Sequence, residues 1–80
     1  MNLEPIEVTA RFAANGTIIP LQFTWKGGTY YVESTGRYWR DDLGYHILVM
    51  AFSEKIYELI FISEEGRWSM GAVQPRRMVV

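Results

Sequence analysis

The chain has 80 residues, no cysteine and a formal net charge of −1, so we expect one small domain spanning residues 1–80. The absence of cysteine excludes disulfides and thiolate metal sites, and the small net charge argues against a strong overall attraction to nucleic acid or anionic lipid. Hydrophobic residues make up 49% and aromatic residues 15% of the sequence, a large share for so small an interior. This surplus predicts either unusually large core side chains or an apolar surface buried against another chain.

The first half of the sequence predicts three strands in succession. Residues 6–12 alternate between apolar and polar side chains, as a half-buried strand does, and Asn15-Gly16 then supplies a turn. Residues 17–25 form the second predicted strand, in which Pro20 marks an edge or a bulge because proline cannot donate to the ladder. Lys26-Gly-Gly28 predicts a tight turn into a third strand over residues 29–34, so the second and third strands form a clear hairpin.

The second half continues the same pattern. Gly36 predicts a bend or bulge before the chain resumes at residues 37–40, and residues 41–44 (Asp-Asp-Leu-Gly) have the composition of a turn. Residues 45–52 and 56–62 are apolar on both faces except at His46 and Glu58, so we expect two central strands with both faces covered. Residues 63–66 predict a type I turn with a glycine bulge.

A last strand is expected over residues 68–73, and residues 74–80 are expected to form a tail that is mobile or packs on a partner. No segment shows sustained helical periodicity. The predicted fold is therefore all-β: a single antiparallel meander of about six strands, curled into a small barrel, which includes an SH3-like barrel, or into a strongly twisted sheet.

Four short motifs in this order resemble a family of small bacterial domains of unknown function. They are Glu4-Pro-Ile-Glu-Val8, Phe23-Thr-Trp-Lys-Gly27 followed by Tyr31-Val32, Tyr57-Glu-Leu-Ile-Phe61, and Gly66-Arg-Trp68. The resemblance spans residues 4–73 and implies no catalytic activity. Some members of the family are associated with DNA-repair polymerase genes, so the resemblance implies nucleic acid or a repair protein as a partner.

The sequence lacks the residue combinations that catalytic and metal-binding sites usually need. A nucleophilic site needs a nucleophile, a base and an orienting group, and this chain offers one histidine and no cysteine. The adjacent pairs Asp41-Asp42 and Glu64-Glu65 are typical of turns, and one histidine is too few for a recognisable zinc site. We therefore expect a protein that is not an enzyme and that carries no metal or other cofactor.

The clearest functional pattern is a set of aromatic and basic residues around the third strand. Exposed aromatic rings beside cations can bind single-stranded nucleic acid, but Tyr, Trp and Arg also dominate protein–protein interfaces. Because Tyr38 and Trp39 are adjacent and point opposite ways in a strand, one of them is expected in the core. Trp25 and Trp68 are expected to be structural. The candidate interaction surface consists of Lys26, Tyr31, Arg37, Tyr38, Trp39, Arg40 and His46.

Three functions remain open at the level of sequence. The first is a non-enzymatic interaction module that contacts a protein partner or forms a homodimer, because two strands with apolar faces on both sides exceed what one small core can bury. The second is an accessory domain that binds single-stranded nucleic acid. The third is a small-ligand carrier or enzyme in a barrel mouth, which would require a pocket containing His46 with a carboxylate nearby. The N-terminus has no signal-peptide pattern and no stretch is long enough for a membrane helix, so a cytoplasmic protein without membrane contact is expected.

Overall fold

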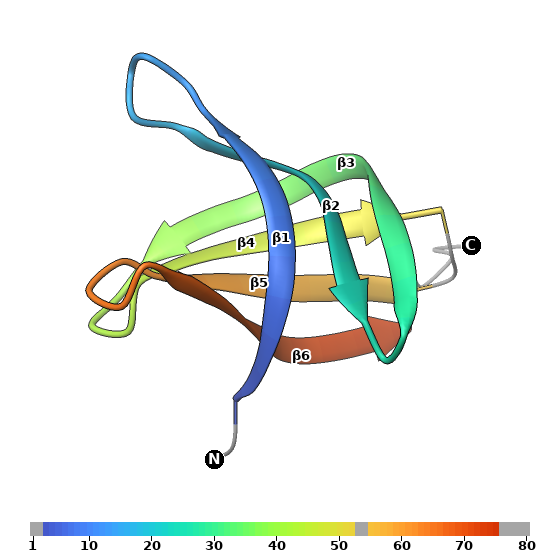
Figure 1. Cartoon of the computed structure of the whole chain (residues 1–80). Coiled ribbons are helices and arrows are strands. Elements are labelled where there is room, and N and C mark those ends of the chain that lie inside the picture. The colour runs from blue at the N-terminus through green and yellow to red at the C-terminus, as the bar shows by residue number, and fades with distance from the viewer. Residues whose placement is uncertain (1–2, 53–54, 76–80) are drawn as a thin grey trace.

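A computed structural model describes residues 3–52 and 55–75 and shows an all-β domain, as the sequence predicts. Six antiparallel strands follow one another around a closed barrel in chain order (Figure 1). No helix in the described part of the chain is long and apolar enough to cross a membrane. The strands are β1 (Glu4–Phe12), β2 (Ile18–Trp25), β3 (Gly28–Arg40), β4 (Tyr45–Ala51), β5 (Lys55–Ile62) and β6 (Arg67–Pro75).

The barrel closes because β1 and β3 each pair with one neighbouring strand over their first residues and with another over the rest. β1 pairs with β6 over residues 4–6 and with β2 over residues 7–12, whereas β3 pairs with β2 over residues 28–31 and with β4 from Val32 onward. Figure 1 shows β1 and β2 curving across the sheet of β3 to β6, with their connecting hairpin projecting beyond it. The pairing of β3 with β4 shifts register on both sides of Ser34–Thr35, so the bulge expected around Gly36 is confirmed.

The turns follow the glycines of the sequence. Lys26 and Gly27 both have positive φ, at 50° and 78°, which is the backbone of a two-residue type I′ hairpin turn. Pro20 lies beside a register shift between β1 and β2, as expected for a strand proline. β6 runs further than predicted, because Gln74 and Pro75 pair with β5; these two residues therefore do not belong to a tail. The rest of the expected tail, residues 76–80, lies outside the described residues.

The core is built from alternate residues of the central strands. In β4 and β5, Ile47, Val49, Tyr57 and Leu59 point inward and are at most 1% exposed. Phe23 stacks on Tyr30 at 5.3 Å between ring centroids and meets Tyr57 edge-on at 4.9 Å. Large aromatic side chains thus account for part of the apolar surplus of the sequence.

The outer faces of β4, β5 and β6 are also substantially buried within one chain. His46 is 6%, Ile60 2% and Ser69 3% exposed, although each alternates with a residue that points into the barrel. The expectation that both faces of β4 and β5 are covered is therefore confirmed for these positions without a second chain. Homodimerisation stays a prediction.

Candidate functional site

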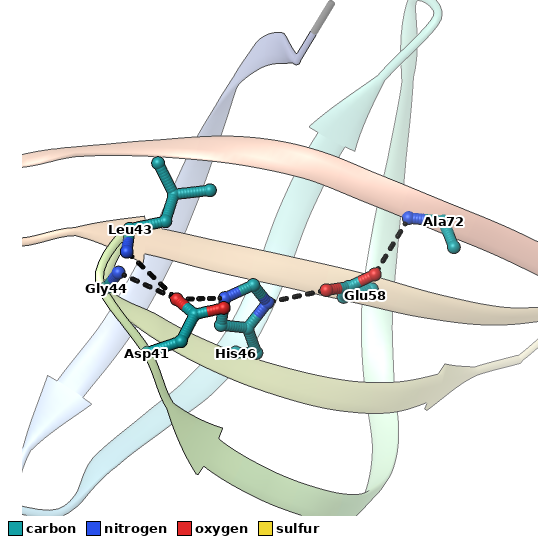
Figure 2. A network of polar contacts seen from close by, with 6 residues as sticks. All are labelled: Asp41, Leu43, Gly44, His46, Glu58 and Ala72. Carbon is teal, nitrogen blue, oxygen red and sulfur yellow. Dashed lines mark hydrogen bonds and ion pairs between the residues drawn. The ribbon is translucent and has the colours of Figure 1, made fainter. Parts of the chain in front are cut away.

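The outer face of β4 and β5 carries a network of ionisable side chains centred on the buried His46, the single histidine of the chain. The Nδ1 atom of His46 lies 2.6 Å from Oε2 of Glu58, and its Nε2 atom lies 2.8 Å from Oδ1 of Asp41. Figure 2 shows the imidazole ring between the two carboxylates, with Asp41 on the turn after β3 and Glu58 on β5. Both ring nitrogens therefore face hydrogen-bond acceptors, and the arrangement favours the imidazolium, in which both nitrogens donate.

Strand register brings His46 and Glu58 together. His46 pairs with Ile60, and Glu58 pairs with Leu48, so the two polar side chains are diagonal neighbours on one face of the β4–β5 pair. The other oxygen of Glu58, Oε1, accepts the backbone N–H of Ala72 at 3.1 Å. A bulge in β6 opposite Glu58 supplies this donor, since the register between β5 and β6 shifts there by one residue.

Gly71, next to that donor, leaves the space that the Glu58 carboxylate occupies. A Cβ atom at position 71 would lie 2.7 Å from Oε1 and 2.8 Å from Cδ of Glu58, closer than such contacts occur. A larger residue at position 71 would therefore displace the Glu58 carboxylate and the tip of Ile60 from their present places.

Asp41 fixes the other side of the network from the β3–β4 turn. Its Oδ1 atom accepts the backbone N–H groups of Leu43 at 2.9 Å and Gly44 at 3.3 Å, in addition to His46. The turn interpretation of this aspartate is therefore confirmed, but the same carboxylate also binds the histidine. Gly44 has a φ of 152°, and a Cβ atom there would lie 2.1 Å from the carbonyl oxygen of Phe61, so the close approach of this turn to β5 requires glycine.

The network shifts the pKa values of two of its members. Burial alone would lower the pKa of His46, but the hydrogen bonds to Glu58 and Asp41 outweigh burial and raise it above its ordinary 6.5. The hydrogen bond from His46, assisted by the N–H groups of Leu43 and Gly44, lowers the pKa of Asp41 below 3.8. Around pH 6 both effects favour a charged histidine beside a charged Asp41.

A cleft of about 610 Å³ lies beside this network. The polar side chains of its wall are those of the network itself, and the remaining wall is largely apolar, with Leu43 in the turn and Ile60 on β5. The pocket required for a ligand site at His46 is therefore present, with two carboxylates nearby. The complete lining is Leu3, Asp41, Leu43, His46, Glu58, Ile60, Met70, Gly71 and Ala72.

Part of the candidate surface predicted from the sequence is assembled at the edge of this network. The Trp39 ring stacks on the His46 ring, with centroids 4.9 Å apart and an interplanar angle of 12°. The guanidinium of Arg37 lies over Trp39, 4.8 Å from the ring centroid. Arg37, Trp39 and His46 therefore form one stack on the outer surface.

The other predicted residues lie elsewhere. Tyr38 and Arg40 point to the opposite face of β3, where both contact Tyr45, at 5.9 Å between ring centroids and at 5.2 Å from guanidinium to ring centroid. The expectation that Tyr38 or Trp39 belongs to the core is wrong: Tyr38 is 41% exposed because it lies near the end of β3, and Trp39 is only half-buried. The stack of Trp39 on His46 holds it on the outer surface.

Lys26 and Tyr31 are separate from this group. Lys26 lies beyond the opposite end of β3, with its ammonium 4.8 Å from the Trp25 ring centroid. Tyr31 is 59% exposed and alternates with the core-packed Tyr30, so it faces outward between the two ends. The seven residues thus do not form one continuous surface.

Asp41 and Glu58 are site residues that are absent from the predicted candidate surface, although the sequence contains a signal for Glu58. Apart from the tyrosines and Lys55 at the start of β5, His46 and Glu58 are the only polar residues of these two neighbouring strands, and their shared face could have paired them. Asp41 was identified only as a turn residue. Trp25 and Trp68 are structural as expected, since both pack in or against the core.

Comparisons with protein-family models, with curated proteins and with solved structures found no match to this chain. The resemblance to a bacterial domain family therefore stays a prediction.

Proposed function

We propose that this chain is a non-enzymatic interaction module that contacts a protein partner through the cleft beside Asp41, His46 and Glu58. The observation that carries the proposal is the combination of an apolar-walled cleft with a charged network whose hydrogen bonds join three strands and a turn. The charge of the buried His46 is costly to desolvate, and a concave apolar cleft with few oriented polar groups is a common form of a ligand-binding site.

The hydrogen bonding of His46 favours binding over catalysis. A general base needs a nitrogen lone pair within reach of a substrate proton, and in this network both nitrogens are engaged with carboxylates. Oε1 and Oε2 of Glu58 are likewise both occupied. The network therefore holds the wall of the cleft in one arrangement and leaves Asp41, whose side chain is 50% exposed, to meet a partner.

The alternative of single-stranded nucleic acid has weaker support from the geometry. Arg37, Arg40 and Lys26 each lie over an aromatic ring of their own chain, so a base that stacks there would have to displace them. These cations also lie in separate places, and the cleft itself carries carboxylates that would repel phosphate.

Capture from a lysate of the source cell with matched variants tests the proposal. Leu43→Ser removes an exposed apolar wall of the cleft while keeping the N–H group that Asp41 binds, and Leu21→Ser makes the same change at an exposed leucine outside the cleft. We expect a protein that the wild-type and Leu21→Ser chains retain after nuclease treatment and that Leu43→Ser loses. An identical protein set with all three chains would refute a partner site in this cleft, and material lost on nuclease treatment would support the nucleic-acid alternative.

A further inference from the structure

The geometry points to a lysine or arginine side chain of the partner as the group that enters the cleft, with its cation at Asp41 and its aliphatic stem along the apolar wall. This inference rests on the proposed function and names the chemistry of the partner. It follows from the charge of the lining, the free acceptor that the lining presents, and the character of the remaining wall.

The lining carries more negative than positive charge. Asp41 and Glu58 are carboxylates, His46 contributes at most one positive charge, and no lysine or arginine is among the lining residues. One negative charge is uncompensated when the histidine is protonated, and two when it is neutral. An anionic group would be repelled in both states, whereas a cation would be attracted in both.

Asp41 offers the acceptor for that cation. The hydrogen bonds that its carboxylate accepts from Leu43, Gly44 and His46 all go to Oδ1. They leave Oδ2 to a ligand, on a side chain that is half exposed. Glu58 is less available, since its side chain is 17% exposed and both its oxygens are engaged.

The remaining wall fits an aliphatic stem better than a bare ion. Leu3, Leu43, Ile60 and Met70 border the charged network, and lysine and arginine pack their methylene chains on such surfaces while the charged head stays at a carboxylate. The described residues contain no group of three side chains that could hold a metal ion. The cleft therefore favours an organic cation on a methylene chain.

Small analogues test this chemistry on the isolated chain. We would titrate α-N-acetyl-lysine-N′-methylamide and the corresponding arginine compound, and follow backbone amide shifts around the cleft and the imidazole signals of His46 by NMR. The Nε-acetylated lysine compound and the norleucine compound keep the stem without the charge. We expect saturable shifts confined to cleft residues with the charged compounds, and at least fivefold weaker binding of both neutral ones.

The protonation of His46 supplies an independent test that the cation binds at Asp41. The charged groups that face it are Asp41 from the turn and Glu58 from β5, and the Trp39 ring from β3 separates it from Arg37. Loss of one positive charge about 5 Å from a bound cation changes affinity about fourfold in a water-like dielectric. The lysine compound should therefore bind about fourfold more tightly at a pH above the pKa of His46 than at a pH below it.

Equal responses to charged and neutral compounds, or no response to the charged ones in a chain whose imidazole still titrates, would overturn the inference. That result would leave the proposed function standing if Leu43→Ser still loses a captured protein that Leu21→Ser retains. If capture is insensitive to Leu43→Ser, the proposed function fails whatever the small compounds do. Asp41→Asn should abolish binding of the lysine compound, whereas Asp42→Asn, a neighbouring exposed change, should preserve it.

Discussion

Replacing Glu58 by glutamine tests the energetic role of the network with little change of shape. A glutamine carbonyl can still accept the N–H of Ala72, but its amide replaces the carboxylate oxygen that lies 2.6 Å from Nδ1 of His46. Because His46 is 6% exposed, its charge then loses a partner in a place where water can hardly replace it. We therefore expect the variant to fold but to be less stable.

The size of the effect follows from the type of interaction removed. A hydrogen bond to a charged group contributes about 1.5–3 kcal/mol, and 1 kcal/mol shifts the melting temperature of a domain of this size by about 4–8 °C. A loss of about 2 kcal/mol therefore predicts a melting temperature lower by about 8–16 °C at pH 5.5. Thermal unfolding followed by circular dichroism measures this directly, and Glu64→Gln provides the same chemical change in an exposed turn.

The stability difference between wild type and Glu58→Gln should decrease as the pH rises. The pKa of His46 is raised in the folded chain, so the stabilisation by its charged form is complete below 6.5 and is lost as the pH rises through the folded pKa. The difference between wild type and Glu58→Gln should therefore be large at pH 5.5 and shrink at pH 9. A melting temperature within 2 °C of wild type at pH 5.5, or a difference that does not depend on pH, would refute this account of the network.

Three further changes probe the same site. Gly71→Ala should lower the free energy of unfolding, measured in urea, by about 1–3 kcal/mol, because its Cβ atom would displace the Glu58 carboxylate. Gly36→Ala, where the nearest contact of a Cβ atom is 3.8 Å, should have little steric effect. Equal losses of stability in the two variants would contradict the packing around Gly71. Gly44→Ala should lower the free energy of unfolding by about 3 kcal/mol or more, because its Cβ atom would collide with the Phe61 carbonyl. An unchanged free energy of unfolding would show that this turn does not approach β5 as described. Asp41→Asn should lower the pKa of His46 in an NMR titration and Asp42→Asn should not, and the reverse order would be inconsistent with the hydrogen bond from Nε2.

Much of the fold is predictable from local residue patterns. The alternation in residues 6–12, the turn at Lys26 and Gly27 and the bulge near Gly36 all report on backbone conformation within a few residues. The end of β6 was harder to predict, because Gln74 and Pro75 are held by pairing with β5 and not by their own sequence preference. The strand order follows from the successive short turns of a meander.

The site depends on contacts between segments, which is why only part of it could be predicted. His46 was selected as a candidate, but its partners depend on the register between β4 and β5 and on the bulge in β6. The predicted aromatic and basic residues do not share one surface, because successive residues of a strand point to opposite faces. Trp39 lies on the face of β3 with His46, and Arg40 lies on the other face with Tyr45. The candidate surface grouped these residues by their adjacency in sequence.

The most direct test of the central claim is the protonation state of His46 at pH 6.5, read from imidazole nitrogen shifts in a uniformly ¹⁵N-labelled chain. The sequence contains one histidine, so the spectrum has a single pair of ring signals and needs no assignment. The network predicts that both nitrogens are predominantly protonated at this pH, since each donates to a carboxylate. A predominantly neutral ring with one unprotonated nitrogen would contradict the arrangement on which the binding site is built.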